Sequence, residues 1–281
     1  AVLNFGATIS HGALRTAVMP EYRDEVRMAL AGLSPDRTED ELEVLGRAIS
    51  LGNYDALNKE HYPELHEQIT QGMAEGALGI GMPHQYYPGA TRDEIFRLFA
   101  HAGPEKFPIY THVRSMGIDA IQEVVANAVA TGTPLHIVHL NSSSLWDIQT
   151  NLDLIQGAQE AGVDVTTEAY PYTAASTSLE SALFDEGWRE RFQITYSDLQ
   201  WQATGERLTE ETFNQYRAEG GTVIIHMMQP EWIEAAMRAP HVMVASDGMP
   251  YDPGAHPRSA GTFSRFLGRY VRDDGVLSLM D

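Results

Sequence analysis

Residues 108–141 read PIYTHVRSMGIDAIQEVVANAVATGTPLHIVHLN, and their pattern decides the fold class that we expect. Two β-rich runs, 108–113 and 135–140, enclose a segment whose apolar residues recur on one helix face, namely Ile118, Ile121, Val124, Val125 and Val129. Gly132 then supplies a natural helix end. A strand, a helix and a second strand in this order are typical of a parallel sheet, because parallel neighbours need a crossover connection.

The same alternation extends over most of the 281 residues. Further β-rich runs are residues 3–10, 77–82, 164–170, 222–227 and 241–246. Two helix starts carry a capping-box pattern, Thr38 with Glu41 and Thr91 with Glu94. Three successive strand starts lie about 27 to 29 residues apart, which is the size of one βα unit. An eight-stranded β/α barrel and a doubly wound sheet both fit this rhythm.

Residues 180–221 interrupt the rhythm. They carry Trp188, Phe192 and Trp201 among several polar turns, and no strand–helix alternation is visible in them. We therefore expect one α/β domain over residues 1–281, with an insertion at about 180–221 that lies over one face.

The charge balance is acidic, since 19 Lys and Arg against 39 Asp and Glu give a formal net charge of −20. Such a surface disfavours nucleic acid and anionic membranes as partners. The chain has no cysteine, which excludes disulfides, thiolate catalysis and Cys-ligated metal within it. With no apolar run of about 18 residues and no visible signal peptide, we expect no membrane span and a cytoplasmic location.

Three β-rich runs end at ionisable residues, His112, His139 and Asp247. The carboxyl ends of parallel strands hold the active site in barrels and in open sheets. Zinc takes imidazole nitrogen and carboxylate oxygen as ligands, and a carboxylate can instead act as general base. A strand histidine is also often a core residue, and a strand-terminal aspartate often caps a helix. Spacing alone leaves these alternatives open, while His136, on the opposite strand face from His139, is expected to be structural.

Six segments carry a resemblance to one family, in the family's own order: ISHGALRTAVM (9–19), MAEGALGIGMPHQYYPGA (73–90), YTHVRS (110–115), VHLNSSS (138–144), TTEAYPYTAAST (166–177), and SDG (246–248) followed by HPR (256–258) and GTFSRFLGRYVRD (261–273). Together they cover nearly the whole chain and resemble the N-acyl-D-amino-acid deacylases, or D-aminoacylases. These are zinc enzymes of the amidohydrolase superfamily. The resemblance implies a metal-dependent (β/α)8 barrel.

The resemblance also implies roles for individual residues. His112 and His139 would be zinc ligands, and Asp247 would be the general acid/base. The substrate-binding residues that it implies are Arg258, for the substrate's carboxylate, and Tyr170, Ser176 and Tyr86. A guanidinium suits a carboxylate because it can grip both oxygens. Tyr172 or Tyr87 could be the contacting ring instead, and Arg258 could serve only to hold a loop.

The chain departs from the family pattern in three places. It has no His-x-His pair, no cysteine ligand, and Asn141 where the family commonly has a lysine. We therefore expect an internal piece of a longer protein, in which the first barrel strands and a flanking small β domain are missing. Because a barrel with a missing wall has unpaired edges, we expect a second copy of the chain or a missing segment to complete it.

The leading hypothesis is a zinc-dependent amide hydrolase that deacylates N-acyl-D-amino acids through a metal-activated water and Asp247 as acid/base. A cyclic-amide hydrolase, of the dihydroorotase or hydantoinase kind, is the alternative within the same class. A non-catalytic barrel fragment without a complete metal site is the alternative from another class. A doubly wound binding domain is disfavoured, because GALGIG (76–81) lacks the spacing of a dinucleotide-binding loop.

Overall fold

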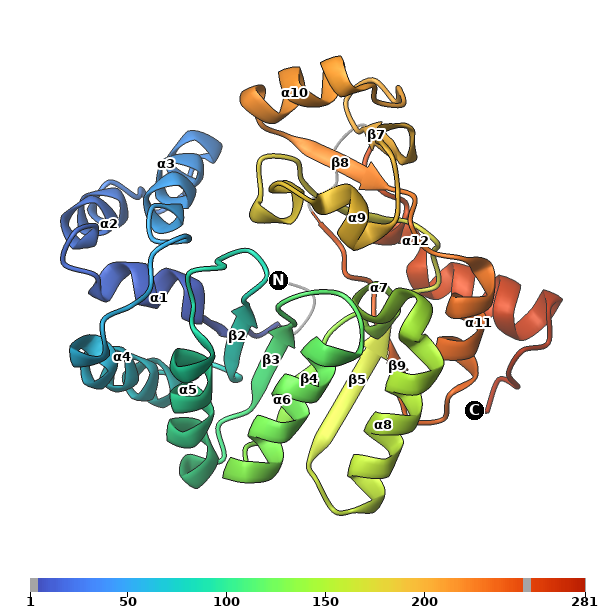
Figure 1. Ribbon diagram of the computed structural model, residues 1–281, viewed down its shortest axis with the longest axis horizontal. Coiled ribbons are helices and arrows are strands. Elements are labelled where there is room, and N and C mark those ends of the chain that lie inside the picture. The colour runs from blue at the N-terminus through green and yellow to red at the C-terminus, as the bar shows by residue number, and fades with distance from the viewer. Residues whose placement is uncertain (1–4, 250–253, 281) are drawn as a thin grey trace. The chain divides into compact units, whose positions relative to one another are not determined.

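The computed structural model describes residues 5–249 and 254–280. The chain forms two compact units, whose helices and strands are labelled in chain order in Figure 1. Unit 1 comprises Ala1–Arg114 and Glu123–His136, and unit 2 comprises Ser115–Gln122 and Ile137–Asp281. Helix α6 (Ile118–Thr131) and strand β4 (Leu135–Ile137) contribute residues to both units.

Unit 1 contains three parallel strands, β1 (Ile9–Ser10), β2 (Ile80–Pro83) and β3 (Ile109–His112). Its remaining elements are α1 (His11–Val18), α2 (Arg23–Ala31), α3 (Glu39–Ser50), the 3-10 helix η1 (Lys59–His61), α4 (Tyr62–Ala74) and α5 (Arg92–Glu105). Helix α1 packs against β2, and α4 packs against β1. The register sets Pro83 beside His112, so the carboxyl ends of β2 and β3 are level.

Unit 2 contains the parallel pair β5 (Val165–Ala169) and β9 (Val242–Val244). The helices that pack against this pair are α7 (Leu140–Ser144), α8 (Ile148–Glu160) and α11 (Pro230–Arg238). The 3-10 helix η2 (Leu145–Asp147) lies between α7 and α8 and contacts both. The last elements of the unit are α12 (Arg258–Arg265) and a π-helical segment, η5 (Phe266–Asp273).

The hydrogen-bonded strand order is β1-β2-β3-β4-β5-β9. Within the described residues this order ends at β1 and β9, so the sheet is open and does not close into a barrel. The prediction of an α/β fold with an incomplete barrel is confirmed. Strands followed by helices of this length produce it, because each helix returns the chain to the start of the next parallel strand.

A second sheet in unit 2 is antiparallel, in the order β6-β8-β7. Its strands are β6 (Ala175–Ser178), β7 (Leu199–Trp201) and β8 (Thr222–Ile225), with η3 (Ala182–Phe184), α9 (Trp188–Phe192), η4 (Tyr196–Asp198) and α10 (Glu210–Glu219) between them. The run 222–227 therefore supplies a strand, as its composition indicates, but not one of the parallel sheet. β-propensity identifies a strand without identifying its partner.

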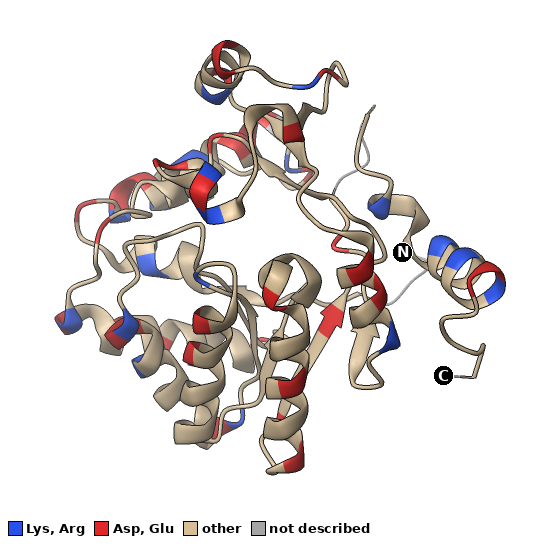
Figure 2. Ribbon diagram, turned by 45° about the vertical axis from the view of Figure 1, so that its right-hand side comes forward, with Lys and Arg blue, Asp and Glu red and all other residues tan. Residues whose placement is uncertain are grey.

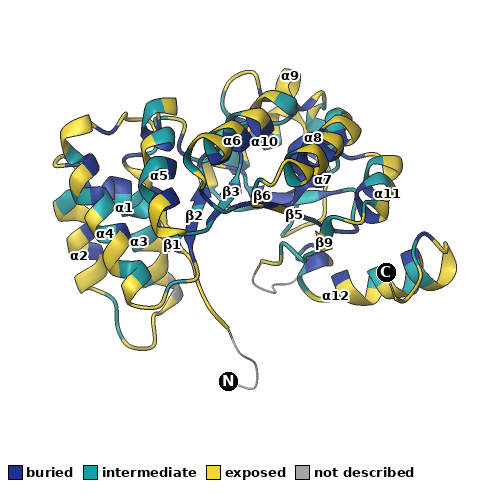
Figure 3. Ribbon diagram, turned by 90° about the horizontal axis from the view of Figure 1, so that it is seen from below, coloured by how far each residue is buried: buried dark blue, intermediate teal, exposed yellow. Residues whose placement is uncertain are grey.

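Strands β2 and β3 alternate buried and half-buried residues, so each has one buried face and one half-buried face. Figure 3 colours the elements by burial. The fully buried side chains are Ile80, Met82, Ile109 and Thr111. His112 and its neighbours on the other face are only half-buried. A closed barrel packs side chains against both faces of its strands. The half-buried face is thus what an open sheet leaves, and it is the face that carries His112.

A buried ion pair joins α1 to α5. Arg15 Nε lies 2.8 Å from Glu94 Oε1, and neither side chain is more than 1% exposed. The remaining guanidinium nitrogens donate to the carbonyls of Gly52 and Asp55, at 2.6 and 2.7 Å. The expected capping box at Thr91 is therefore only half formed: Thr91 accepts from the Glu94 backbone, but the Glu94 side chain turns inward to Arg15. At Thr38 both halves of the predicted box are present.

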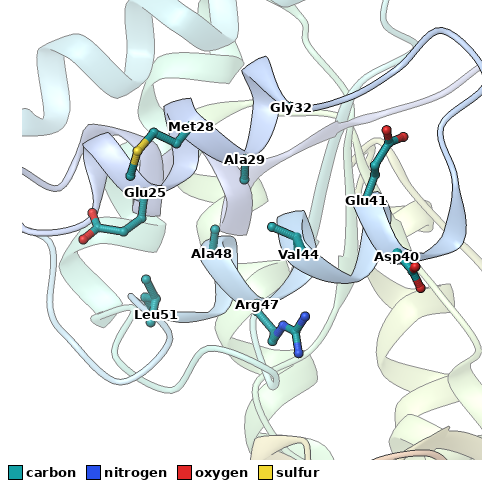
Figure 4. Close-up of a pocket in the computed structure, with 10 residues that line it drawn as sticks. All are labelled: Glu25, Met28, Ala29, Gly32, Asp40, Glu41, Val44, Arg47, Ala48 and Leu51. Carbon is teal, nitrogen blue, oxygen red and sulfur yellow. The ribbon is translucent and has the colours of Figure 1, made fainter.

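An apolar groove of about 550 Å³ lies between α2 and α3, away from the strand ends (Figure 4). Val26, Ala29 and Ala48 form the small core between the two helices. Met28 is 67% exposed on the rim of the groove, with Glu25 and Arg47 among its polar lining residues. The groove contains no nucleophile and no histidine, so we do not place the chemistry there.

Acidic residues are spread over the helices of both units, with fewer basic residues among them (Figure 2). This agrees with the net charge of −20. In the part of the chain that the structure describes, every helix is too short or too polar to cross a bilayer.

We expect Arg15→Met to lower the free energy of unfolding by about 3–5 kcal/mol, because it leaves Glu94 buried without its counter-charge. Urea unfolding at neutral pH measures this loss. The matched control is Arg47→Met, whose ion pair with Glu43 is exposed and whose loss should change stability by at most about 0.5 kcal/mol. Equal losses in the two variants would mean that the buried Arg15–Glu94 pair contributes no more to stability than an exposed pair does.

A second prediction concerns the stacked rings of His66 on α4 and His101 on α5, whose centroids lie 4.4 Å apart. Burial, and then the neighbouring His101, lower the pKa of His66 to about 4. As the pH falls from about 6.5 towards 4, the unfolded chain binds a proton that folded His66 does not, so stability falls over this window. His66→Phe should reduce the slope of the unfolding free energy against pH over this window. Urea unfolding of the variant and the wild type at a series of pH values measures this slope. If His66 were charged when folded, the substitution would not reduce it.

Candidate active site

The three ionisable residues predicted at strand ends do follow strands of the parallel sheet. His112 is the last residue of β3, in unit 1. His139 follows the end of β4, and Asp247 follows the end of β9, both in unit 2. The hydrophobic pattern predicted these places because each apolar run is a strand whose carboxyl end carries the polar residue.

His112 lies within a small cluster in unit 1. Its Nε2 is 2.5 Å from Gln85 Oε1, so that nitrogen carries the proton in this arrangement. The ring of Tyr86 meets the imidazole edge-on, with centroids 5.0 Å apart. The structure thus brings together two predicted site residues, His112 and Tyr86. Tyr87, the alternative ring, is instead buried, and its hydroxyl lies 3.0 Å from His11 Nδ1.

Two further histidines follow strands in unit 1, and both are fully buried. His11 follows β1 and lies 3.4 Å from Glu94, beside Arg15. His84 follows β2, with Nδ1 3.3 Å from Thr111 Oγ1. Burial, and then the Arg114 charge, lower the pKa of His84 to about 3, so it is neutral at physiological pH. These contacts assign His11 and His84 to the packing of unit 1.

His139 adopts an unusual backbone conformation, with φ 37° and ψ 57°. Its Nδ1 lies 3.0 Å from Ser142 Oγ and 3.2 Å from Ser143 Oγ, and its own carbonyl is 3.1 Å from Ser142 Oγ. A serine that gives its one hydrogen to that carbonyl accepts from Nδ1–H, which leaves the ring's lone pair at Nε2. Metal-binding histidines are held in this way by a partner on their second nitrogen.

Asp247 and Arg258 form an ion pair in unit 2. Arg258 Nη1 lies 2.8 Å from Asp247 Oδ2. The arginine side chain is 2% exposed and the aspartate 33%. Asp247 has φ 48°, in the left-handed region that non-glycine residues rarely adopt. The predicted proton carrier and the predicted carboxylate binder are therefore in direct contact.

Arg258 is anchored by two other predicted site residues. Its Nη2 donates to the backbone carbonyl of Ser176 at 3.0 Å, and its guanidinium lies 4.9 Å from the ring centroid of Tyr170. Its backbone N–H donates to His256 Nδ1 at 3.0 Å. Burial, and then the Arg258 charge, lower the pKa of His256 to about 4, so that nitrogen can accept. The structure thus brings Asp247, Arg258, Tyr170 and Ser176 together.

Tyr170 is fully buried, and its hydroxyl has no hydrogen-bond partner among the described residues. Burial raises its pKa to about 12, against the opposing effect of Arg258, so the hydroxyl keeps its proton. Asn141 holds the Tyr170 backbone from both sides: its Nδ2 donates to the carbonyl at 3.2 Å, and its Oδ1 accepts from the N–H at 3.3 Å. Asn141 therefore positions Tyr170.

A cavity of about 360 Å³ lies beside this cluster in unit 2. Its lining includes His256 and Pro257, which directly precede Arg258, together with Tyr172 and Arg265. The ring of Tyr172 meets His256 edge-on at 5.1 Å, and its hydroxyl donates to the Pro257 carbonyl at 3.4 Å. This volume suits a small ligand of amino-acid size.

The donor chemistry of His112 and His139 fits a zinc ion, since both offer imidazole nitrogen and His139 has hydroxyl partners on its other nitrogen. The two histidines belong to different units. Across residues 5–249 and 254–280, no three His, Cys, Asp or Glu side chains are grouped to hold a metal ion. Each histidine by itself thus offers a donor that zinc accepts, and the described part of the chain does not assemble a full set of ligands.

Sequence reasoning missed the residues that hold the site. Sequence analysis gave no role to Gln85 beside His112 or to Ser142 and Ser143 beside His139, and it noted Asn141 only as a departure from the family pattern. A signal was present in VHLNSSS, where three serines directly follow a strand-end histidine. Hydroxyls one helical turn after such a histidine can reach its ring, which is the contact that the structure contains.

No protein-family model matches the chain. D-aminoacylase of Alcaligenes xylosoxydans xylosoxydans is 28% identical over 302 residues, covering 99% of this chain and 54% of that protein. N-acyl-D-glutamate deacylase of the same organism is 29% identical and covers 76% of this chain and 47% of that protein. The chain thus spans about half the length of the curated relatives that it matches.

Among solved structures, N-acyl-D-glutamate deacylase from Bordetella bronchiseptica, complexed with zinc and a phosphonate inhibitor, aligns with a TM-score of 0.70. The identity is 21%, over 98% of this chain and 71% of that one. At this identity the likeness shows the fold. Taken together, the comparisons show a chain that is similar in sequence to D-aminoacylase and N-acyl-D-glutamate deacylase, and similar in fold to the solved N-acyl-D-glutamate deacylase.

Proposed function

We propose that the protein to which these residues belong is a zinc-dependent amide hydrolase that deacylates N-acyl-D-amino acids. The observation that carries the proposal is the cluster after β9 and β5, in which a carboxylate, a buried guanidinium and a protonated phenol meet. These are the groups that moving a proton and holding a carboxylate require. The similarity to D-aminoacylase over 99% of the chain supports the same reaction class.

His112 and His139 are the residues that would hold the metal. A bound zinc ion would supply the activation of water and the polarisation of the amide carbonyl. The zinc named with the Bordetella bronchiseptica enzyme supports this choice of metal. His139 suits the role because Ser142 and Ser143 fix its ring orientation. His112 must lose a hydrogen bond before its Nε2 can bind the metal, because this nitrogen carries the proton that is directed at Gln85 Oε1.

Asp247 is the proposed acid/base. It takes a proton from the attacking water and gives it to the leaving amine. The aspartate is one-third exposed and follows a sheet strand, so its carboxylate is supported by rigid structure and remains accessible.

Arg258 is the proposed partner of the substrate's α-carboxylate. Its burial fixes the fork-shaped guanidinium in one direction, which suits a two-point contact. The Tyr170 hydroxyl, buried and without a partner in the described residues, is available to donate to the bound substrate. We assign Ser176 and Tyr86 as further substrate contacts, through their positions beside Arg258 and His112.

A catalytically inactive fragment is the second candidate. The absence of a three-ligand group among the described residues favours it. Metal content separates the two candidates directly.

Zinc content by plasma mass spectrometry is therefore the first test. We expect about one zinc per 281-residue chain after purification with zinc, and at least a tenfold lower content in the His112→Ala/His139→Ala double variant. His226→Gln is the matched control, because this histidine lies after β8 and bonds to Gln200. Its zinc content should equal that of the wild type. No zinc in any of the three would favour the inactive fragment.

Hydrolysis of N-acetyl-D-amino acids is the second test. Asp247→Asn should lower kcat by about 10²–10⁴-fold, the usual contribution of general acid–base catalysis, with zinc content unchanged. Asp273→Asn, which removes an exposed carboxylate paired with Arg272, is the control and should keep wild-type kcat. A full rate in Asp247→Asn would remove Asp247 from the mechanism.

A further inference from the structure

We propose that the apolar groove between α2 and α3 receives the exposed face of the α12–η5 segment of a second copy of the chain. In this contact, unit 1 of one copy binds unit 2 of its partner copy, so each copy offers one groove and one helical segment. The contact is independent of the proposed hydrolysis, because the side chains that form it are not those of the candidate active site.

The groove gathers apolar side chains that remain open to solvent. Met28 is 67% exposed, and Val44 and Leu51 are nearly half exposed. All three line the groove, whose volume is about 550 Å³ (Figure 4). Apolar side chains gathered in this way mark a place where another surface packs.

The lining of the groove is also acidic. It includes the carboxylates of Glu25, Asp40 and Glu41. Arg47 lines it too, but this arginine lies 3.1 Å from Glu43, so its charge is already balanced. The groove therefore favours an apolar partner that carries positive charge, and a second groove of the same kind would be repelled.

The α12–η5 segment has the complementary character. Residues 256–272 contain four arginines and no acidic residue, in a chain whose net charge is −20. Phe263 and Leu267 are 59% and 49% exposed. Residues four apart lie on one face of a helix, so these two side chains can enter a groove together.

Two arginines of the segment are able to change partners. Arg269 pairs with Asp274 at 3.1 Å and Arg272 with Asp273 at 2.7 Å, and these four side chains are between 46 and 76% exposed. Exposed ion pairs contribute little to stability, so exchanging one carboxylate partner for another costs little. The carboxylates of a partner's groove can therefore take the place of Asp273 and Asp274.

Other side chains fix the segment to unit 2. Arg265 Nε donates to the Pro171 carbonyl at 2.7 Å, and Tyr270 is 5% exposed. The exposed face of the segment thus belongs to an element that is already ordered, and docking it costs little conformational entropy.

The first test is sedimentation velocity of the 281-residue chain over a range of concentrations. The mean mass should rise with concentration, and added salt should shift the rise to higher concentration, because salt screens exposed charges. A rise that salt promotes would indicate a contact between two acidic grooves and would overturn the proposal. A monomer at every concentration would overturn it too, and would leave the groove to a different partner.

Charge reversal identifies the two surfaces. Asp40→Lys and Arg269→Glu should each weaken self-association at least about tenfold, because each brings like charges together. An equimolar mixture of the two variants should associate again, since the unaltered groove of one meets the unaltered segment of the other, which a misfolded variant could not do. Glu160→Lys, at an exposed residue of α8, is the control and should associate like the wild type. A mixture that stays dissociated would contradict the contact.

Cysteine cross-linking tests the contact directly, because the chain has no cysteine of its own. Under mild oxidation, Val44→Cys mixed with Leu267→Cys should give disulfide-linked pairs of chains, since a disulfide requires close approach of the two residues. The matched control mixes Leu267→Cys with Val129→Cys, at an exposed residue of α6, and should give few such pairs. Equal yields in the two mixtures would mean random collision and would refute the proposed contact.

Discussion

The buried ion pair between Arg15 and Glu94 is the contact on which unit 1 depends. It joins the helix that follows β1 to the helix that follows β2, and it also binds the backbone at Gly52 and Asp55. The register of β2 sets Pro83 beside His112, so the loop ahead of α5 runs close to the candidate metal ligand. A charge pair without water nearby tolerates little displacement. The position of His112 thus follows from residues that have no part in chemistry.

A similar series of polar contacts organises unit 2, and its members are themselves residues of the candidate site. Asn141 holds the Tyr170 backbone, the Tyr170 ring lies against Arg258, and Arg258 faces Asp247. Networks of this kind define one arrangement when every member is satisfied. This one is incomplete, since the Tyr170 hydroxyl and Arg258 Nε have no partner among the described residues. The two open positions mark where a ligand would complete it.

The sequence predicted the strands and the residues at their ends, because hydrophobic periodicity and strand direction together place His112, His139 and Asp247. It did not predict which side chains contact one another. Glu94 matches a capping box in sequence but turns inward, since an arginine far along the chain is its stronger partner. Asn141 is interpreted from sequence as a position where a lysine is expected, yet in the structure it bonds to the backbone of Tyr170, directly after β5. Such choices depend on which elements meet, and local patterns do not contain that information.

Backbone conformation separates the candidate site from its surroundings. Among the described residues, the non-glycine positions with positive φ include Lys106, Leu145 and Gln193, each of which ends a helix, where a left-handed residue is common. His139 and Asp247 instead follow strands of the parallel sheet, with φ 37° and 48°. No helix end accounts for Asp247, and His139 begins a helix. Strain of this kind persists only where surrounding contacts hold it, and it gathers where a side chain must point in one direction. The two positions so held are those at which the proposed function needs a nitrogen donor and a proton carrier, and for Asp247 one holding contact is the ion pair with Arg258.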